Sequence, residues 1–424
     1  MAPVAAVPYP MNVQQTYQEW REPGAATWRQ WGSGIESEAI NQMRNACSLP
    51  VSAAGALMPD AHVGYGLPIG GVLAVRAAVI PYAVGMDIAC RMRLTVVDLP
   101  VSYLDGARGK LRQALEEETC FGVGGAWTPR RNHEVMDADW DVSPVTRRFR
   151  DKAWAQLGTS GGGNHFAEFG VLTVTDPALG LAAGAYLALL SHGGSRGTGG
   201  ELCRHYSRVA AARHPDLPKH LKQLAWLPLS SAEGREYWEA MQLMGRYAAA
   251  NHELMHAGIV RHLKLKVRLT IENHHNFAWK EKVPDSGLRT PDSGSRPPAA
   301  GCLTPDSVLV VHRKGATPAH AGVLGVVPGS MATPGFVVRG KGCAEALNSC
   351  AHGAGRRLSR SVAKQSLTWS QAKKFLSERG VELISGGLDE VPMVYKDIHA
   401  VMQAQADLVD VLARFDPRLV KMAP

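Results

Sequence analysis

The sequence predicts an α+β fold, because helical and strand-like segments are mixed along the chain without strict alternation. Short apolar runs rich in valine, isoleucine and glycine are broken by glycine and proline, a pattern typical of buried strands. Longer polar segments carry arginine, histidine and lysine on what would be exposed helix faces. With 424 residues and 45% hydrophobic content, the chain can bury a sizeable core, and we expect a single domain over residues 1–424.

The N-terminal part of the chain contains the first predicted strands. In the first 50 residues, tryptophans stand among polar residues, and we interpret this segment as one or two helices leading into the core. Two apolar runs, residues 70–75 and 93–99, are typical of buried strands. Between them, residues 79–91 predict a loop that sets polar groups in an apolar context.

The remaining elements follow from the same patterns. We expect helices in residues 102–155, 200–264, 360–380 and 396–414, and strands in residues 171–176, 186–194, 267–276 and 307–316. Residues 284–300 are rich in proline, glycine and serine, which cannot form a core, and they predict a mobile loop.

The composition limits the classes of function. No run of 18 apolar residues is present, and the N-terminus lacks the pattern of a signal peptide, so we expect a cytoplasmic protein with no membrane association. A net charge of +8 fits a polyanionic partner such as nucleic acid, although no RRM, KH or zinc-knuckle signature is visible. The seven cysteines are scattered without a CxxC pair, which argues against a disulfide framework.

Asp87 and Cys90 form the first candidate for chemistry. A carboxylate and a thiol three residues apart can point to the same side of a turn or short helix. Together they offer one hard and one soft donor to a metal ion. The alternative is a surface aspartate beside a buried cysteine.

A glycine run at residues 157–170 is the second candidate, since it brings Asn164, His165 and Glu168 close together. His165 can ligate a metal, while Asn164 and Glu168 can hydrogen-bond a ligand that the glycine backbone approaches closely. The alternative is a glycine-rich turn with a histidine facing solvent.

Two further strand-like segments end in histidine. His192 closes one of them and is followed by glycines and Arg196; the alternative is a capped turn. His274 and His275 close another. Because neighbouring side chains of a strand point to opposite faces, only one of these two can enter a shared site.

His352 is followed by Gly-Ala-Gly, which suits a histidine at the start of a helix whose backbone N–H groups face a phosphate. Arg356, Arg357 and Arg360 add positive charge, and with Arg196 they are candidates for phosphate contacts. The alternative is an ordinary glycine turn entering a basic helix. Across these segments, three histidines, one cysteine and one aspartate predict a binuclear site for manganese, iron or zinc, in which a thiolate could bridge two ions.

The motifs that carry these residues resemble those of the RtcB RNA ligases. They occur in that family's order between about residues 58 and 421: MPDAHVGYGLPIGGVLA, VIPYAVGMDIAC, GTSGGGNHFAEF, SHGGSRG, NHHNFA, RKGAT, VPGSM, HGAGR, VPMVYKD and a terminal VK. The resemblance implies a single RtcB-like domain with mixed β-sheets flanked by helices around a central metal and nucleotide cleft.

The resemblance also implies roles for individual residues. Two Mn²⁺ ions would be bound by Asp87, Cys90, His165, His192 and His275, with Cys90 bridging them. His352 would take GMP from GTP, and Asp60 would orient its ring. The guanylate pocket would be lined by Asn164, His165, Phe166, Ala167, Glu168, His275, Asn276, Pro328, Gly329, Ser330, Met331, His352, Gly353, Ala354, Gly355, Tyr395 and Lys421.

The implied reaction joins an RNA 3′-phosphate or 2′,3′-cyclic phosphate end to a 5′-hydroxyl end, in tRNA splicing or RNA repair. The expected partners are RNA and an accessory activating protein, and the expected state is a monomer. Two alternatives remain open at this point. One is a divergent enzyme that acts on other broken nucleic acid ends or mainly hydrolyses cyclic phosphates, and the other is a non-catalytic RNA-binding protein.

The chain departs from the family pattern at several positions. Arg91 replaces the glycine that usually follows the metal-binding cysteine, where it would either contact a substrate phosphate or crowd the metals. Gly335 replaces a serine, which removes one hydroxyl contact to guanylate. Residues 284–300 resemble an insertion. All five implied ligands and the implied nucleophile are retained.

Overall fold

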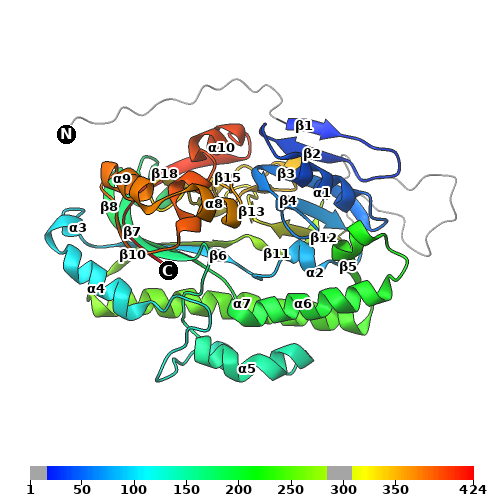
Figure 1. The fold of residues 1–424 in the computed structure, drawn as a ribbon, viewed down its shortest axis with the longest axis horizontal. Coiled ribbons are helices and arrows are strands. Elements are labelled where there is room, and N and C mark those ends of the chain that lie inside the picture. Colours follow the sequence, from blue (N-terminus) through cyan, green and yellow to red (C-terminus); the bar gives the residue numbers. More distant parts are fainter. Residues whose placement is uncertain (1–16, 284–307) are drawn as a thin grey trace.

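The computed structural model describes residues 17–283 and 308–424, so the loop predicted at residues 284–300 lies outside the described residues. Strands and helices are mixed in two large sheets with helices packed around them (Figure 1), which confirms the predicted α+β class. Among the described helices, none combines the length and the apolar character that crossing a membrane requires.

The larger sheet follows the order β10-β6-β8-β7-β18-β15-β14, and β17 pairs with β18 outside this path. All neighbouring strands are antiparallel except β17 and β18, which are parallel. The strands are β6 (Arg91–Val97), β7 (Phe166–Val174), β8 (Gly184–Gly193), β10 (Val267–His274), β14 (Leu324–Val327), β15 (Gly335–Gly340), β17 (Glu382–Ser385) and β18 (Val409–Met422).

The smaller sheet follows the order β1-β2-β3-β4-β12-β11. Its strands are β1 (Tyr17–Trp20), β2 (Trp28–Trp31), β3 (Ser52–His62), β4 (Ile69–Val75), β11 (Asn276–Lys282) and β12 (Val308–Lys314). Two short ladders complete the described strands: β5 (Ala78–Val79) pairs with β9 (Leu227–Pro228), and β13 (Ala316–Pro318) pairs with β16 (Ser349–Ala351).

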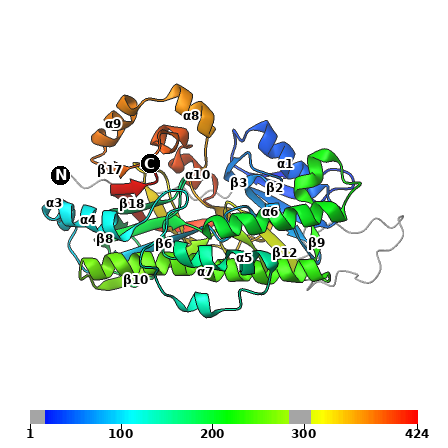
Figure 2. The same cartoon turned by 60° about the horizontal axis from the view of Figure 1, so that its bottom comes forward.

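The helices cover both sides of these sheets. The long helices α6 and α7 run along one side, with α5 beyond them, while α8, α9 and α10 lie on the other (Figures 1 and 2). The α-helices are α1 (Ser37–Cys47), α2 (Pro81–Val84), α3 (Tyr103–Gly106), α4 (Arg108–Glu118), α5 (Pro144–Gln156), α6 (Arg196–Arg213), α7 (Ala232–His262), α8 (Arg360–Ser366), α9 (Trp369–Glu378) and α10 (Ile398–Ala404). Short 3₁₀ turns are η1 (Glu134–Asp137), η2 (Pro177–Leu179), η3 (Lys219–Leu224), η4 (Ala344–Ala346), η5 (Leu388–Glu390) and η6 (Pro392–Val394).

Local sequence sets several helix starts. Ser143 accepts a hydrogen bond from the N–H of Val145 at the start of α5, and Pro144 occupies the first helical position, where a missing N–H does no harm. Thr368 and Gln371 form a reciprocal capping box at the start of α9.

Most predicted elements are confirmed, including a helix within the first 50 residues, which is α1, whereas two stretches differ from the prediction. The N-terminal tryptophans lie in strands, because Trp20 and Trp28 are register partners in β1 and β2 and stack with ring centroids 5.1 Å apart. In the segment predicted as a helix at 396–414, α10 ends at Ala404 and residues from Val409 onward enter β18. Burial between β7 and β15 overrides the local helical tendency of that segment.

One end of the larger sheet concentrates polar residues. Because β6, β7, β8 and β10 are antiparallel neighbours, the starts of β6 and β7 meet the ends of β8 and β10 at that end. The register places His192 opposite both Met92 and Phe166, and His274 opposite Arg91. Residues just before β6 and β7 and just after β10 are therefore brought together.

Candidate active site

Five side chains with metal-binding atoms meet at this end of the sheet. Cys90 directly precedes β6, and His165 directly precedes β7. His192 is the second-to-last residue of β8, and His275 directly follows β10. Asp87 lies in the loop between α2 and β6. The backbone joins these segments as well, since the N–H of His275 donates to the carbonyl of Cys90 at 3.0 Å.

Cys90, His192 and His275 form one group of possible ligands, with their donor atoms within 4.8 Å of one another. The Nε2 atom of His192 lies 3.0 Å from Sγ of Cys90 and 3.2 Å from Nε2 of His275. Nδ1 of His192 donates to the carbonyl of Asn164 at 3.1 Å, so its Nε2 carries a lone pair rather than a proton. Lone pairs that converge in this way suit a cation between them.

Asp87, Cys90 and His165 form a second group within the same distance limit. Nε2 of His165 lies 2.8 Å from Oδ2 of Asp87 and 3.6 Å from Sγ of Cys90. Cys90 belongs to both groups. A thiolate shared by two groups of ligands is the arrangement that a bridging ligand between two ions requires.

Burial sets the charge states of these groups. It lowers the pKa of His192 to about 3 and that of His275 well below the ordinary value, so both imidazoles are neutral and able to coordinate. Burial also raises the pKa of the Cys90 thiol, which a bound cation would reverse. For Asp87, burial raises the pKa, but the charge and hydrogen bond of His165 outweigh it and hold the pKa below its usual range. This donor set of nitrogen, sulfur and oxygen fits divalent transition metals.

His352 lies beside this cluster, with its ring centroid 4.9 Å from that of His275. Oδ2 of Asp60 accepts hydrogen bonds from Nδ1 of His352 at 2.6 Å and from the backbone N–H of His352 at 3.1 Å. Nε2 is therefore the ring nitrogen left for chemistry. The expected helix start is wrong here: His352 follows β16, and the next helix, α8, begins at Arg360.

A cavity of about 500 Å³ connects these residues. Most of the implied metal and guanylate residues line it: Asp87, Cys90, Asn164, Phe166, Glu168, His192, His275, Asn276, Pro328, Gly329, Ser330, Met331, His352, Gly353, Ala354, Gly355 and Tyr395. Asp60, His165, Ala167 and Lys421 do not line it. His165 and Asp60 lie behind the wall and contact the lining residues Asp87 and His352.

Lys421 is held away from the cavity. Its ammonium group donates to the carbonyls of Leu115, Glu116 and Thr119 at 3.1, 3.2 and 3.3 Å, at the C-terminal end of α4. Cations are favoured at that end of a helix. The strand residue that follows, Met422, lines the cavity instead.

Glu168 is a buried acid on the cavity wall. Its side chain is 3% exposed, and burial raises its pKa well above the ordinary value. Burial therefore favours the neutral form of Glu168 more than it would for an exposed carboxyl, and in that form the side chain can donate a hydrogen bond to a ligand in the cavity.

Comparison with known proteins agrees with this arrangement. The family model described as tRNA-splicing ligase RtcB matches residues 42–143 and 130–422. The chain belongs to the RtcB family. It is 30% identical to the RNA-splicing ligase RtcB of Escherichia coli K12, over 91% of this chain and 94% of that protein. It is 31% identical to the tRNA-splicing ligase RtcB of Nanoarchaeum equitans, over 90% and 91%, and to the RNA-splicing ligase RtcB of Mycobacterium tuberculosis, over 89% and 98%.

Arg91, one of the departures from the RtcB pattern, turns away from the candidate metal ligands. Its guanidinium donates to Glu272 at 2.7 Å and to the carbonyl of Gly245 in α7 at 3.3 Å, and it does not line the cavity. It therefore neither contacts a substrate in the cavity nor crowds the ligands. His274 also points away, packing against Phe277 and Trp279 with ring centroids 5.0 Å apart in each case, as the strand alternation predicted.

The arginines after His352 have partners that the sequence did not reveal. Arg356 donates to Glu390 at 2.9 Å and to the carbonyl of Asp389 at 2.7 Å, while Tyr395 donates its hydroxyl to Glu390. Arg360 bridges the Asp389 and Glu390 carboxylates. The only sequence signal was the acidic pair just before the VPMVYKD motif. These arginines are partly neutralised, unlike the free phosphate-binding cluster that the sequence suggested.

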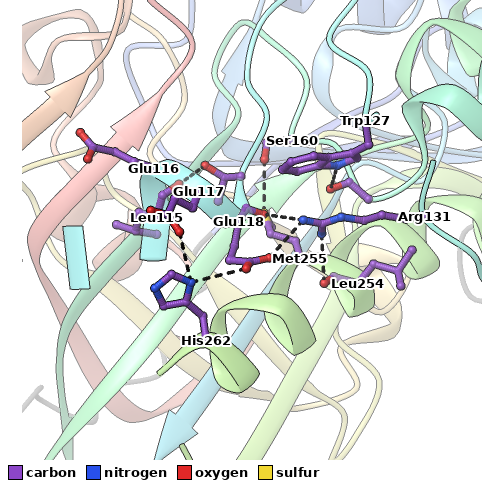
Figure 3. Close-up of polar contacts among 12 residues, drawn as sticks. Leu115, Glu116, Glu117, Glu118, Trp127, Arg131, Ser160, Leu254, Met255 and His262 are labelled. Atoms are coloured by element: carbon purple, nitrogen blue, oxygen red, sulfur yellow. Dashed lines mark hydrogen bonds and ion pairs between the residues drawn. The ribbon is translucent and has the colours of Figure 1, made fainter. Parts of the chain in front are cut away.

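A brace behind the glycine loop was also missed (Figure 3). The indole of Trp127 donates to the carbonyl of Gly158 at 3.1 Å, and the guanidinium of Arg131 lies 3.9 Å from the centre of that ring. Arg131 also donates to Glu118 at 3.2 Å and to the carbonyl of Leu254 at 3.4 Å. The segment that carries Asn164 and His165 is therefore tied to α4 and α7.

Asn251 of α7 links two loops that carry candidate metal ligands in this RtcB family member. Its side-chain oxygen accepts from the N–H of Gly158 at 2.8 Å, and its amide group donates to the carbonyl of Gly194 at 3.2 Å. One buried side chain thus joins the loop before His165 to the loop after His192. A buried asparagine in the middle of a long helix has no sequence pattern that could have predicted this contact.

Proposed function

We propose that this chain is a GTP- and Mn²⁺-dependent RNA ligase that joins 3′-phosphate or 2′,3′-cyclic phosphate ends to 5′-hydroxyl ends through guanylylated His352. The names of its relatives, RNA-splicing and tRNA-splicing ligases, support RNA ends as substrates, in tRNA splicing or RNA repair. The observation that carries the proposal is the position of His352, held by Asp60 and set beside two groups of metal ligands that share Cys90.

Asp60 prepares His352 to act as a nucleophile. By accepting the proton of Nδ1, the carboxylate fixes the tautomer in which Nε2 has a free lone pair. As Nε2 forms a bond to phosphorus, the ring acquires positive charge, which the fully buried carboxylate of Asp60 stabilises. The same carboxylate also bonds the backbone of His352, so ring and main chain are fixed together.

Asp87, Cys90, His165, His192 and His275 are the residues that would hold two ions. Bound Mn²⁺ would supply neutralisation of phosphate charge and alignment of the attacking and leaving oxygens. The chain's own contribution is to keep the imidazoles of His192 and His275 neutral through burial, which lowers the pKa of both, and to fix the ring of His192 through Asn164.

The reaction then has three steps. Nε2 of His352 attacks the α-phosphorus of GTP, an N–P bond forms, and pyrophosphate leaves. The RNA 3′-phosphate next takes GMP from His352, which restores the free imidazole. The 5′-hydroxyl of the second RNA end attacks the activated 3′-phosphate, forms the phosphodiester and expels GMP. A 2′,3′-cyclic phosphate is first opened by hydrolysis in the same cavity.

Labelling with GTP tests the proposal directly. The protein is incubated with Mn²⁺ and GTP labelled at the α-phosphate, and we expect acid-labile, hydroxylamine-insensitive label on the protein, the behaviour of a phosphoramidate. The label is lost in His352→Ala and in Cys90→Ala. His399→Ala is the matched control, because this histidine is exposed at the start of α10. We expect the His399→Ala variant to be labelled as the unmodified protein is.

The outcomes separate the alternatives. Label retained in His352→Ala rejects the assigned nucleophile. Label without joined RNA favours an enzyme that acts on other ends or mainly hydrolyses cyclic phosphates. Absence of label in the unmodified protein, together with RNA binding, favours a non-catalytic binder. Arg91 lends no support to a divergent chemistry, because its side chain points away from the cavity.

A further inference from the structure

An exposed apolar cluster lies at the wall of the active-site cavity. Val63, Tyr65 and Met86 are 40%, 60% and 38% exposed, and all three line the cavity together with Tyr82. The rings of Tyr65 and Tyr82 have centroids 6.2 Å apart and are tilted by 40°. In the described part of the chain, Tyr65 and Trp369 are the aromatic side chains among the exposed large hydrophobic residues.

The exposure of Tyr65 does not come from a loose loop. The N–H of Val63 donates to Glu36 at 2.7 Å, and Gly64 exchanges two hydrogen bonds with the side chain of Gln42. The N–H of Gly66 donates to the side-chain oxygen of Gln223 at 2.9 Å. Gly66 has a φ of +71°, and a Cβ atom there would lie 2.9 Å from the carbonyl oxygen of Gln223, so glycine is required.

Lys314 fixes the same loop from inside the cavity. Its ammonium group donates to the carbonyls of Tyr65 and Leu67, and its side chain lines the cavity. The backbone around Tyr65 is therefore fixed on both sides while its ring remains in solvent. Because the backbone that carries the ring is already fixed, the loop loses little conformational freedom when the ring binds a flat partner.

We propose that Tyr65, with Tyr82 and Met86 at its edge, is a stacking site for an unpaired nucleobase next to the RNA end that enters the cavity. This inference rests on the proposed function, which places a strand terminus at His352. A terminal phosphate on the cavity floor brings its adjoining base along the wall that these side chains form. Stacking on a ring tolerates every base, as an enzyme that joins ends of varied sequence needs.

Binding of short single-stranded RNA, measured by fluorescence anisotropy without GTP, tests the stacking site. We expect Tyr65→Ala to weaken binding by about 5- to 150-fold, the range for loss of one base–aromatic stack. Tyr65→Phe keeps the ring and binds as the unmodified protein does. Trp369→Ala is the matched control, because this tryptophan is 38% exposed and does not line the active-site cavity.

Two further readouts distinguish stacking from a general disturbance. The slope of log affinity against log salt stays unchanged in Tyr65→Ala, because no phosphate contact is lost, whereas Arg357→Ala flattens it. RNAs with an abasic nucleotide at the 3′ or the 5′ terminus show which base is bound. We expect the RNA that lacks the stacked base to bind the unmodified protein and Tyr65→Ala with equal affinity.

Equal affinity of Tyr65→Ala and the unmodified protein for intact RNA overturns the inference. The inference also fails if the difference in affinity between these two proteins is as large with both abasic RNAs as with intact RNA. If Tyr65→Ala does not fold, the abasic RNAs measured on the unmodified protein decide, because the inference requires a loss of affinity with one of them. Labelling by GTP is scored separately. Its absence in the unmodified protein rejects the proposed function, while the anisotropy result still stands for RNA binding.

Discussion

Oδ2 of Asp60 lies 2.6 Å from Nδ1 of His352 and 3.1 Å from the backbone nitrogen of the same residue. The two residues are 292 positions apart in the chain, and the carboxylate is fully buried. Lys396 secures the strand around Asp60 by donating to the carbonyls of Pro59 and Ala61 at 3.3 and 2.6 Å. A single carboxylate therefore sets both the tautomer and the position of the proposed nucleophile.

Asp60→Asn should slow labelling by GTP at least about 100-fold, the usual lower range for loss of a group that controls proton position. The amide can donate to Nδ1, which favours the tautomer in which Nε2 carries the proton and cannot attack. Single-turnover labelling measures the rate constant. Circular dichroism and metal content should match those of the unmodified protein, and a labelling rate equal to that of the unmodified protein would remove Asp60 from the mechanism.

The shared position of Cys90 predicts a difference in metal stoichiometry among ligand variants. His275→Ala should abolish one metal site and leave the other, because the group of Asp87, Cys90 and His165 remains intact. Cys90→Ala should weaken both. Titration with Co²⁺, followed by its thiolate charge-transfer absorption and by metal analysis, gives the count. Loss of both sites in His275→Ala, or retention of one full site in Cys90→Ala, contradicts a bridging thiolate.

Trp127→Phe removes the hydrogen bond to Gly158 and keeps an aromatic ring under Arg131. We expect Co²⁺ affinity to fall about fivefold at the site that uses His165, as loss of roughly 1 kcal/mol from one hydrogen bond implies. The site formed by Cys90, His192 and His275 should keep its affinity, since the brace contacts the loop before His165. Equal weakening of both sites would indicate a general loss of stability instead.

Arg313 and Glu281 form a bidentate ion pair, with distances of 2.6 and 3.0 Å, next to the cavity residue Lys314. The Arg313 side chain is fully buried. Glu281→Gln leaves the buried guanidinium charge of Arg313 without its ion-pair partner. This should reduce the free energy of unfolding by about 3–5 kcal/mol. Chemical denaturation at neutral pH measures this loss, and a change below about 1 kcal/mol would contradict it.

The same pair predicts a pH dependence. Burial raises the pKa of Glu281, but hydrogen bonds from His320 and Arg313 outweigh it, so the folded-state pKa lies below the ordinary value of 4.5. The unfolded state therefore binds more protons in this range, and the stability from the pair is present above pH 4.5 and is lost as the pH falls through the folded pKa. The acid-induced loss should be smaller in Glu281→Gln than in the unmodified protein.

Sequence patterns predicted the donors of the site better than its surroundings. Glycine-flanked strand ends pointed to Cys90, His165 and His192, because each follows or precedes an apolar run whose end could be located. The strand alternation also predicted that only one of His274 and His275 enters the site, while the choice of His275 came from the resemblance to the RtcB ligases. What the patterns could not give is the place of β6, because it pairs with β8 and β10, which lie far along the chain, whereas β7 and β8 are consecutive strands.

The surroundings depend on contacts without local signatures. Asn251 and Trp127 act through hydrogen bonds to distant backbone groups, and nothing in their own segments marks them. The misassigned β18 shows the same effect at the level of an element, because its strand conformation comes from its place between two other strands.

The interior position of β18 affects how the protein is made. Until residues 409–422 leave the ribosome, β7 has a partner on one side only, and its free edge can pair with strands of other nascent chains. His165 directly precedes that strand, so its position depends on the insertion of β18. The side chains of the candidate site therefore reach their places only after residues 409–422 have been synthesised and inserted beside β7.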